Sequence, residues 1–118
     1  MPRTRSAPDD VLPLKPADFH ILMVLLEGER HGYGIMQQVV EQSGGAVRLE
    51  LGSLYRLIAR MTDLGLIADA NRRRADDDRR RYYRVTPYGR EVAKHEARRL
   101  EEVVRTARAH KLLEDKPA

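Results

Sequence analysis

Residues 49–89 read LELGSLYRLIARMTDLGLIADANRRRADDDRRRYYRVTPYG, and this stretch decides the fold. Its first part carries an apolar stripe at the helical spacing i, i+3, i+4, i+7, formed by Leu54, Leu57, Ile58, Met61 and Leu64. The opposite face of the same helix is polar and basic, with Arg56 and Arg60 four residues apart and therefore side by side. We predict a helix that packs one face on the core and presents the other face to a partner.

Two short strands should follow that helix. Gly65 suits the left-handed residue that caps a helix C-terminus, and residues 66–70 and 81–86 have the length and apolar content of strands. By the period of two, Tyr83 and Val85 share the core-facing side of the second strand. A loop rich in arginine and aspartate joins the two segments into a hairpin. A helix followed by a basic hairpin predicts a mainly α fold with a small β-hairpin, of the winged helix-turn-helix type.

Two further helices are expected before this unit. Residues 16–28 begin with a proline and are so apolar that they predict a buried helix, either in the core or partly in a dimer interface. A second helix should cover residues 31–43 and stop at two glycines. We expect His31 to cap or support this helix rather than bind a ligand, and Tyr33 to pack in the core, with a phosphate contact as the alternative. Residues 1–14 have no periodicity and should form a flexible arm.

The last helix should run from Tyr88 to about Leu113, because Thr86 and Pro87 supply a cap and a helix-starting proline. Its apolar stripe is too thin for a helix buried in a monomer but sufficient for pairing with another protomer. We therefore predict a homodimer. The residues predicted at the dimer interface are Phe19, Leu22, Val92, Leu100, Val103, Val104 and Ala107.

The composition excludes several other classes of protein. A chain of 118 residues with 42% hydrophobic residues allows one domain with a modest core. It contains no cysteine and only four scattered histidines, which excludes disulfides and thiolate sites and suggests no metal cluster. The longest apolar run, residues 21–26, is too short to span a membrane, and residues 1–15 lack the apolar segment of a signal peptide. We expect a cytoplasmic protein without a cofactor.

The positive charge is concentrated in the centre of the chain. Residues 48–94 hold 12 Arg or Lys against 7 Asp or Glu, whereas residues 1–47 hold 4 against 6 and residues 95–118 hold 6 against 5. The central segment therefore accounts for the whole formal charge of +4. A basic surface on one helix and hairpin is typical of a protein that binds a polyanion, since each neutralised phosphate releases counterions. The alternative is a solvated, charged surface without a partner.

A helix that enters the major groove of DNA presents its N-terminal residues to base edges and phosphates. Here Gly52 allows close approach of the backbone, and Ser53 can cap the helix or donate its hydroxyl to a phosphate. Tyr55 can contact a phosphate oxygen or, alternatively, pack half-buried under the wing. Arg56 can read guanine through two hydrogen bonds, worth ~1–3 kcal/mol of discrimination. The predicted DNA contacts are Gly52, Ser53, Tyr55, Arg56, Arg60, Arg72, Arg73, Arg74, Arg79, Arg80 and Arg81.

The hairpin loop predicts binding rather than catalysis. Its six arginines flank three consecutive aspartates, Asp76, Asp77 and Asp78. Neighbouring opposite charges can pair and screen each other, so we expect two or three of the arginines to contact DNA. Carboxylates in such a loop would be solvated rather than tuned, and the chain has no nucleophile motif or phosphate loop. The sequence therefore predicts no enzymatic activity.

Three motifs follow one another in a specific order and spacing: HGY at residues 31–33, GSLYRL with LGLI within residues 52–67, and RYYRVT at residues 81–86 followed by Gly89. Together they resemble the PadR family of bacterial transcriptional regulators, over nearly the whole chain. The resemblance implies a winged helix-turn-helix, usually a repressor, that dimerises through its C-terminal helix. With a single helix after the wing, the chain is similar to the smaller PadR subfamily. Some relatives bind hydrophobic small molecules between protomers. Leu51 is a departure from the family pattern, which often has a proline immediately before the residue that corresponds to Gly52.

We therefore predict a sequence-specific regulator that binds double-stranded DNA at an inverted-repeat operator, a repressor released by an unknown small-molecule signal. The predicted organisation is a flexible arm at residues 1–14, a DNA-binding domain at 15–87, a dimerisation helix at 88–113 and a tail at 114–118. The alternative from another class is a protein-interaction module, because winged helices can present the same helix to a protein.

Overall fold

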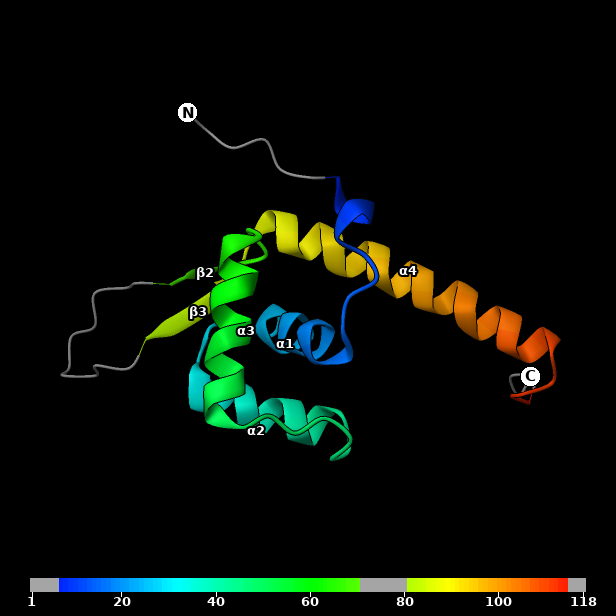
Figure 1. Cartoon of the computed structure of the whole chain (residues 1–118), viewed down its shortest axis with the longest axis horizontal. Coiled ribbons are helices and arrows are strands. Elements are labelled where there is room, and N and C mark those ends of the chain that lie inside the picture. The colour runs from blue at the N-terminus through cyan, green and yellow to red at the C-terminus, as the bar shows by residue number, and fades with distance from the viewer. Residues whose placement is uncertain (1–6, 71–80, 115–118) are drawn as a thin grey trace.

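The structure, a computed structural model, describes residues 7–70 and 81–114. The described helices gather around α1, and the strands lie at one end of the molecule (Figure 1). In chain order the elements are the 3-10 helix η1 (Pro8–Val11), α1 (Pro16–Leu26), β1 (Arg30–His31), α2 (Gly32–Gln42), α3 (Leu51–Asp63), β2 (Ile67–Asp69), β3 (Tyr82–Val85) and α4 (Pro87–Ala109). The predicted class, mainly helical with a small antiparallel sheet, is confirmed.

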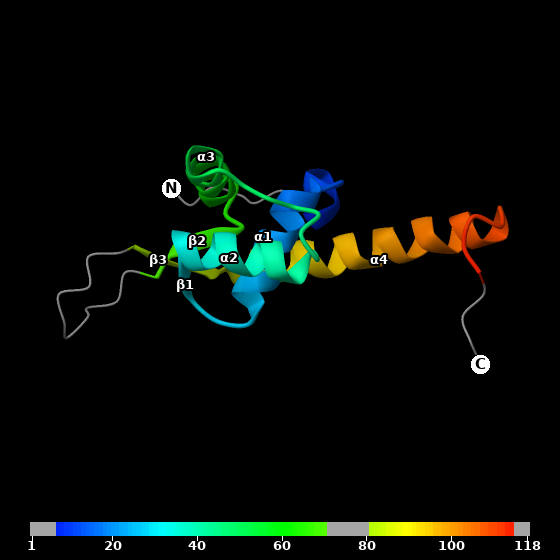
Figure 2. The same cartoon turned by 90° about the horizontal axis from the view of Figure 1, so that it is seen from below.

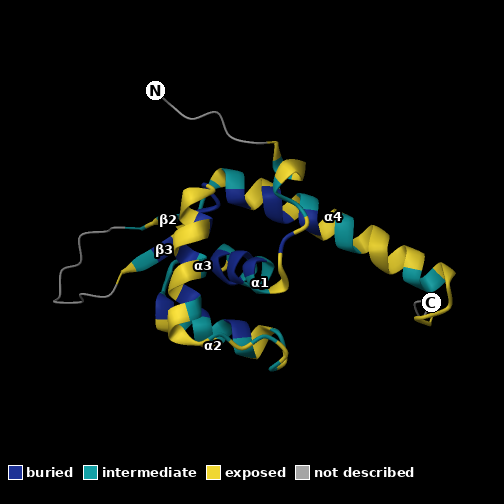
Figure 3. Cartoon of the chain, viewed as in Figure 1, coloured by how far each residue is buried: buried dark blue, intermediate teal, exposed yellow. Residues whose placement is uncertain are grey.

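Helix α1 forms the centre of the core because nearly all of its side chains are apolar. Ile21, Leu22 and Val24 are fully buried, and the helix packs against α2, α4 and β3. Nearly all of it is coloured as buried or intermediate in Figure 3. Burial of each large aliphatic side chain contributes about 1.5–3 kcal/mol. Leu22 therefore belongs to the core of a single chain, as does the fully buried Val92 of α4, and their predicted places at a dimer interface are wrong. Phe19 is half-buried against the same core.

Helix α3 buries one face, as its periodicity predicts. Leu54, Ile58 and Met61 are at most 4% exposed. Leu64 is 42% exposed, because the helix has ended and this residue is its C-cap, so its predicted place in the buried stripe is wrong. Gly65 then has a φ of 80°, the left-handed conformation predicted for the residue after the cap.

The sheet has the strand order β1-β3-β2, and both pairings are antiparallel. Strands β2 and β3 form the predicted hairpin, with Ile67 opposite Val85 and Asp69 opposite Tyr83. Tyr83 is buried and Val85 is half-buried, which confirms the predicted core-facing side. The sequence does not predict the third strand, β1, because its two residues are too few to show an alternating pattern.

Helix α4 begins where the sequence predicts and is tied to the wing at its first turn. The Thr86 hydroxyl accepts a hydrogen bond from the Gly89 N–H at 2.9 Å, and Pro87 is the first helical residue. The same hydroxyl donates to the carbonyl of Gly65 at 2.6 Å, while the Thr86 N–H donates to the carbonyl of Leu66 at 3.0 Å. The start of α4 is therefore fixed to the turn between α3 and β2.

The other end of α4 stops at Ala109, earlier than the predicted end near Leu113. Lys111 has a φ of 62°, and the N–H groups of Lys111 and Leu112 donate to the carbonyls of Arg108 and Ala107, each at 2.9 Å. These two bonds are those of a Schellman cap. The C-terminal half of α4 extends beyond the other described helices (Figures 1 and 2).

Residues 8–14 are not the flexible arm that the sequence predicts. Helix η1 packs against α4, and Leu14 is 8% exposed. The Leu14 N–H donates to Glu96 Oε2 at 3.2 Å, and Arg99 donates to both Glu96 carboxylate oxygens, at 2.6 and 3.0 Å. Glu96 is 1% exposed, and such a carboxylate requires partners. The segment thus packs on α4, and its last residue supplies one of the hydrogen bonds to the buried Glu96 carboxylate.

Candidate nucleic-acid interface

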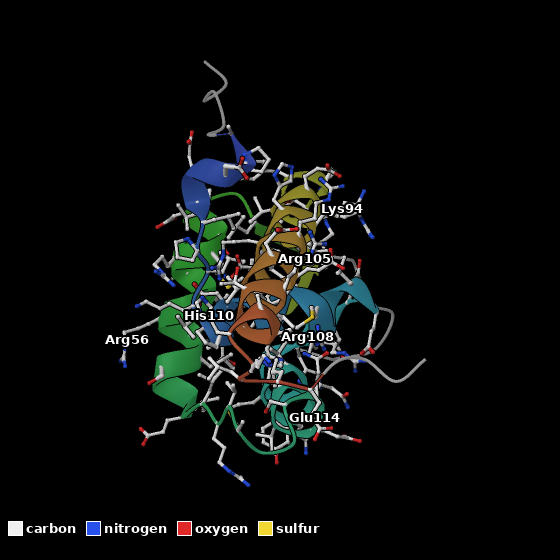
Figure 4. All side chains as sticks on the ribbon, turned by 90° about the vertical axis from the view of Figure 1, so that its right-hand side faces the viewer. Arg56, Lys94, Arg105, Arg108, His110 and Glu114 are labelled. Carbon is white, nitrogen blue, oxygen red and sulfur yellow. The ribbon has the colours of Figure 1, made fainter. Side chains whose placement is uncertain are left out.

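Helix α3 lies on an outer face of the molecule, next to the hairpin (Figures 1 and 2). On its exposed side, Arg56 projects away from the rest of the described chain (Figure 4). The Arg56 guanidinium donates to the Ser53 hydroxyl at 3.1 Å, which holds it beside the first turn of the helix. The N-terminal half of α3 thus presents a basic, hydrogen-bonding surface to solvent.

The N-terminus of α3 lacks a side-chain cap. Glu50 is the N-cap residue and accepts no hydrogen bond through its side chain, so a capping role for Ser53 is wrong. Leu51 and Gly52 are exposed, and a Cβ built on Gly52 would have no heavy atom closer than Arg56 Nη1 at 3.8 Å. Packing within the chain therefore does not require a glycine here. The exposed helix N-terminus, with its positive end of the dipole, suits an anion such as a phosphate.

Tyr55 combines the two roles between which the sequence leaves a choice. It is 47% exposed, yet its hydroxyl lies against Gly32 at the start of α2, where an added Cβ would approach it to 2.8 Å. With Arg81 and Tyr83, it also lines a hollow of about 310 Å³ between α3 and the hairpin. Burial raises the pKa of Tyr83, so that hydroxyl stays protonated. Tyr55 is thus oriented by packing and remains accessible.

Arg60 does not project freely beside Arg56 as predicted. Its guanidinium donates to Asp18 Oδ2, in the first turn of α1. Asp18 is 3% exposed, and burial raises the pKa of this carboxyl while the charge of Arg60 opposes the rise. The arginine is held by a carboxylate inside the chain, and the sequence gives no sign of this because the two residues are far apart along it.

The wing is described only at its base. Arg81 is exposed, and its Nε lies 3.4 Å from Asp69 Oδ2 across the hairpin, the kind of local pairing expected to screen wing arginines. Arg84 is also exposed. The other predicted wing contacts lie outside the described residues and stay predictions; they are Arg72, Arg73, Arg74, Arg79 and Arg80.

The start of α2 lies beside this surface. His31 is the N-cap, and its Nδ1 accepts a hydrogen bond from the Gly34 N–H at 3.1 Å, which confirms the predicted capping role. The His31 ring also packs edge-on against Tyr82, with centroids 5.4 Å apart. Tyr33 is 56% exposed, so its predicted place in the core is wrong. Gly32, which follows the cap, lies against the Tyr55 hydroxyl, so the start of α2 borders the N-terminal half of α3.

Within residues 7–70 and 81–114, no three His, Asp or Glu side chains are grouped as a metal site would require. Nor is any described helix long and apolar enough to cross a membrane.

An amphipathic helix with an exposed basic face, preceded by α2 and followed by a two-stranded wing, defines the winged helix-turn-helix class. The family can then be named from the sequence match. The chain belongs to the transcriptional regulator PadR-like family, whose model matches residues 21–95. Membership confirms the resemblance drawn from the motifs and the predicted class, a transcriptional regulator rather than an enzyme.

Solved structures of similar fold come from several bacteria. A transcriptional regulator from Clostridium thermocellum is 27% identical, with 79% of this chain and 87% of that chain covered and a TM-score of 0.67. A PadR family regulator from Clostridium difficile R20291 is 23% identical, with 81% and 98% covered and a TM-score of 0.71. Bacillus subtilis PadR, solved in complex with operator DNA, is 19% identical, with 88% of this chain but 50% of that chain covered and a TM-score of 0.58. The last two similarities establish the fold alone.

A curated relative from Lysinibacillus sphaericus, an uncharacterised protein, is 29% identical over 72 residues. The match covers 61% of this chain and 66% of that relative's length. It extends the set of similar sequences and adds no function.

Proposed function

We propose that this protein binds double-stranded DNA with sequence specificity. The N-terminal half of α3 contacts base edges in the major groove, and the wing contacts the phosphate backbone of the DNA. The observation that carries the proposal is the position of Arg56, exposed and projecting from a helix whose other face is buried (Figure 4). Gly52, Ser53 and Tyr55 lie on the same turns, where a groove-reading helix makes its contacts. The complex of Bacillus subtilis PadR with operator DNA supports this use of the fold.

The test begins with selection of bound sites from a pool of random duplexes, followed by affinity measurements at several salt concentrations. Arg56→Ala should weaken operator binding by ~1–3 kcal/mol and relax preference at one base position. Lys94→Ala removes an exposed cation on α4, far from Arg56 (Figure 4), and should leave affinity unchanged. Recovery of no preferred site, with wild type and Arg56→Ala equal on every duplex, would favour the protein-interaction module instead.

We further propose that two copies pair through the outer half of α4. Val92, Glu96, Leu100, Val103 and Ala107 follow one another at intervals of three or four residues and therefore lie on one face of α4. The first two of these residues are buried in the chain. Val103 is 52% exposed, and most residues in this half of the helix are coloured as exposed (Figure 3). Beyond it the exposed apolar residues include Val104, Leu112 and Leu113. The face that packs on the core thus becomes a bare stripe suited to a second copy.

A two-fold dimer would place two α3 helices in successive major grooves, about one turn or ~34 Å apart, and would require an inverted-repeat operator. Light scattering at micromolar concentration tests this arrangement. Wild type should have twice the 13.6 kDa mass of one chain, and the double variant Leu100→Glu, Val103→Glu should have the single mass and weak operator binding. The control Glu101→Gln lies on the same helix but carries no part of the stripe. A dimer that survives the double variant would refute this interface.

We propose repression as the regulatory outcome, released by a small molecule. A hollow of about 510 Å³ between residues 9–13 and α4 has the size of a small-molecule site and is lined by Leu12, His95 and Arg98. Its wall is held in place in part by the contact between Asp9 Oδ1 and His95 Nδ1, at 2.8 Å. A reporter downstream of the selected operator should rise when the protein is absent. A fall in the reporter would identify an activator.

A further inference from the structure

We propose that the ion pair between Asp18 and Arg60 positions the DNA-reading helix, so that Arg60 acts on recognition through Asp18 and not by touching DNA. The inference rests on the DNA-binding function proposed above. It assigns to a buried carboxylate on α1 a role in operator recognition, although Asp18 faces the interior of the chain.

One member of the ion pair is buried, and the other is partly exposed to solvent. The Asp18 side chain is 5% exposed and that of Arg60 is 44% exposed. Asp18 Oδ2 accepts the hydrogen bond from Arg60 Nη2, while Oδ1 is buried and has no hydrogen-bond partner among the described residues. The charge of Lys15 also acts on this carboxyl, but more weakly than that of Arg60. Arg60 is therefore the main compensation for a buried charge, which the fold requires.

The pair joins two helices that both pack against α2 but otherwise have different packing partners. Helix α3 packs mainly against α2 and β2, whereas α1 packs mainly against α2, α4 and β3. Asp18 is in the first turn of α1, and Arg60 is in the last turn of α3. A specific bond between these two turns fixes the inclination of α3 relative to α1. Apolar packing along one stripe of α3 would define this inclination less closely.

This inclination matters for reading because Arg56 is one helical turn before Arg60. A change in the tilt at Arg60 displaces the Arg56 guanidinium and the exposed first turn of α3. Two hydrogen bonds to a base edge tolerate little displacement, whereas attraction to phosphates is less sensitive to orientation. Loss of the pair should therefore lower the preference for the operator more than it lowers affinity for DNA in general.

A direct phosphate contact by Arg60 and a positioning role for Arg60 lead to different measurable results. If Arg60 contacted a phosphate, Arg60→Gln would weaken binding to all duplexes and reduce the salt slope by about 0.9, whereas Asp18→Asn would not change that slope. If Arg60 is a positioning residue, the two variants should have the same effect. Each should lower the ratio of operator affinity to random-duplex affinity by roughly 5- to 100-fold, the cost of losing one base contact.

The experiment compares Asp18→Asn, Arg60→Gln and the double variant Asp18→Asn, Arg60→Gln on the selected operator and on a random duplex. The expected result is an equal fall in the affinity ratio for both single variants, no further fall in the double variant, and an unchanged salt slope. Arg56→Gln, one turn away and exposed, is the matched control for a direct contact. An unchanged ratio in Asp18→Asn, or a reduced slope in Arg60→Gln alone, would overturn the proposal.

Amide hydrogen exchange of the free protein keeps this inference separate from the proposed function. Asp18→Asn and Arg60→Gln should both speed exchange in the C-terminal half of α3, whereas Arg56→Gln should not. If wild type prefers no duplex, the DNA-binding function fails, and the exchange data still decide whether the pair positions α3. Exchange rates in α3 equal to wild type in both variants would show that it does not.

Discussion

Replacing Gly89 by alanine should destabilise the protein, although alanine is the better helix former by about 1 kcal/mol. Gly89 lies in the first turn of α4, where an added Cβ would lie 2.0 Å from the carbonyl oxygen of Leu66 and 3.0 Å from a methyl group of Val85. Both neighbours belong to the base of the wing, and backbone cannot rotate away as a side chain can. The helix must move, which disturbs two hydrogen bonds, from the Thr86 N–H to the Leu66 carbonyl and from the Thr86 hydroxyl to the Gly65 carbonyl.

Overpacking of this kind costs about 1–3 kcal/mol, and the two weakened hydrogen bonds cost about 1 kcal/mol each. After the gain in helix propensity, the free energy of unfolding should fall by about 2–4 kcal/mol. Chemical denaturation at one fixed protein concentration measures this change. The matched control is Gly52→Ala in α3, which meets nothing closer than 3.8 Å and should be neutral or stabilising. A Gly89→Ala protein as stable as wild type would refute the steric argument.

Three other substitutions test separate parts of the structure. Glu96→Gln should lower the free energy of unfolding by about 1–3 kcal/mol, because it removes the charged acceptor that holds Leu14, and proteolysis should then cleave residues 7–14 faster. Gly32→Ala should displace the Tyr55 hydroxyl and weaken operator binding, with less than about 1 kcal/mol change in stability, since only the end of a side chain must move. Burial raises the pKa of Asp18, so the folded chain binds this proton more tightly than the unfolded chain does. The free energy of unfolding should therefore fall as pH rises from the ordinary pKa of 3.8 through the raised pKa. Urea titrations at several pH values should show a weaker dependence of this free energy on pH for Asp18→Asn than for wild type.

Local sequence chemistry predicts the main helices, the hairpin and several of their ends. The apolar spacing of α3, the left-handed Gly65, the His31 cap and the start of α4 at Thr86 and Pro87 each depend on residues within one or two turns of one another. The basic composition of residues 48–94 likewise predicts the candidate interface, because charge is additive along the chain. Arg56 is accordingly found exposed on the predicted face.

Contacts between distant segments are not predicted. Asp18 and Arg60 are 42 residues apart, and Leu14 and Glu96 are 82 apart. In the sequence, Arg60 and Glu96 look like ordinary charges on amphipathic helices, and only the packing shows that each is assigned to a partner in the interior. For this reason the sequence predicts neither the ion pair of Arg60 nor the packing of residues 8–14 against α4.

The stripe on α4 shows how a correct pattern can join two different environments. Its spacing is continuous from Val92 to Ala107, so the sequence predicts one interface, but the structure buries Val92 and Glu96 in the chain's own core and leaves Val103 bare. The helix is continuous across this boundary, from Pro87 to Ala109. A second copy bound to the outer half would therefore be fixed relative to the inner half, and through the first turn of α4 relative to the wing. Any molecule that changes the crossing angle of the two outer halves of α4 would change the separation of the two α3 helices. This separation must match the spacing of the two half-sites in an inverted-repeat operator.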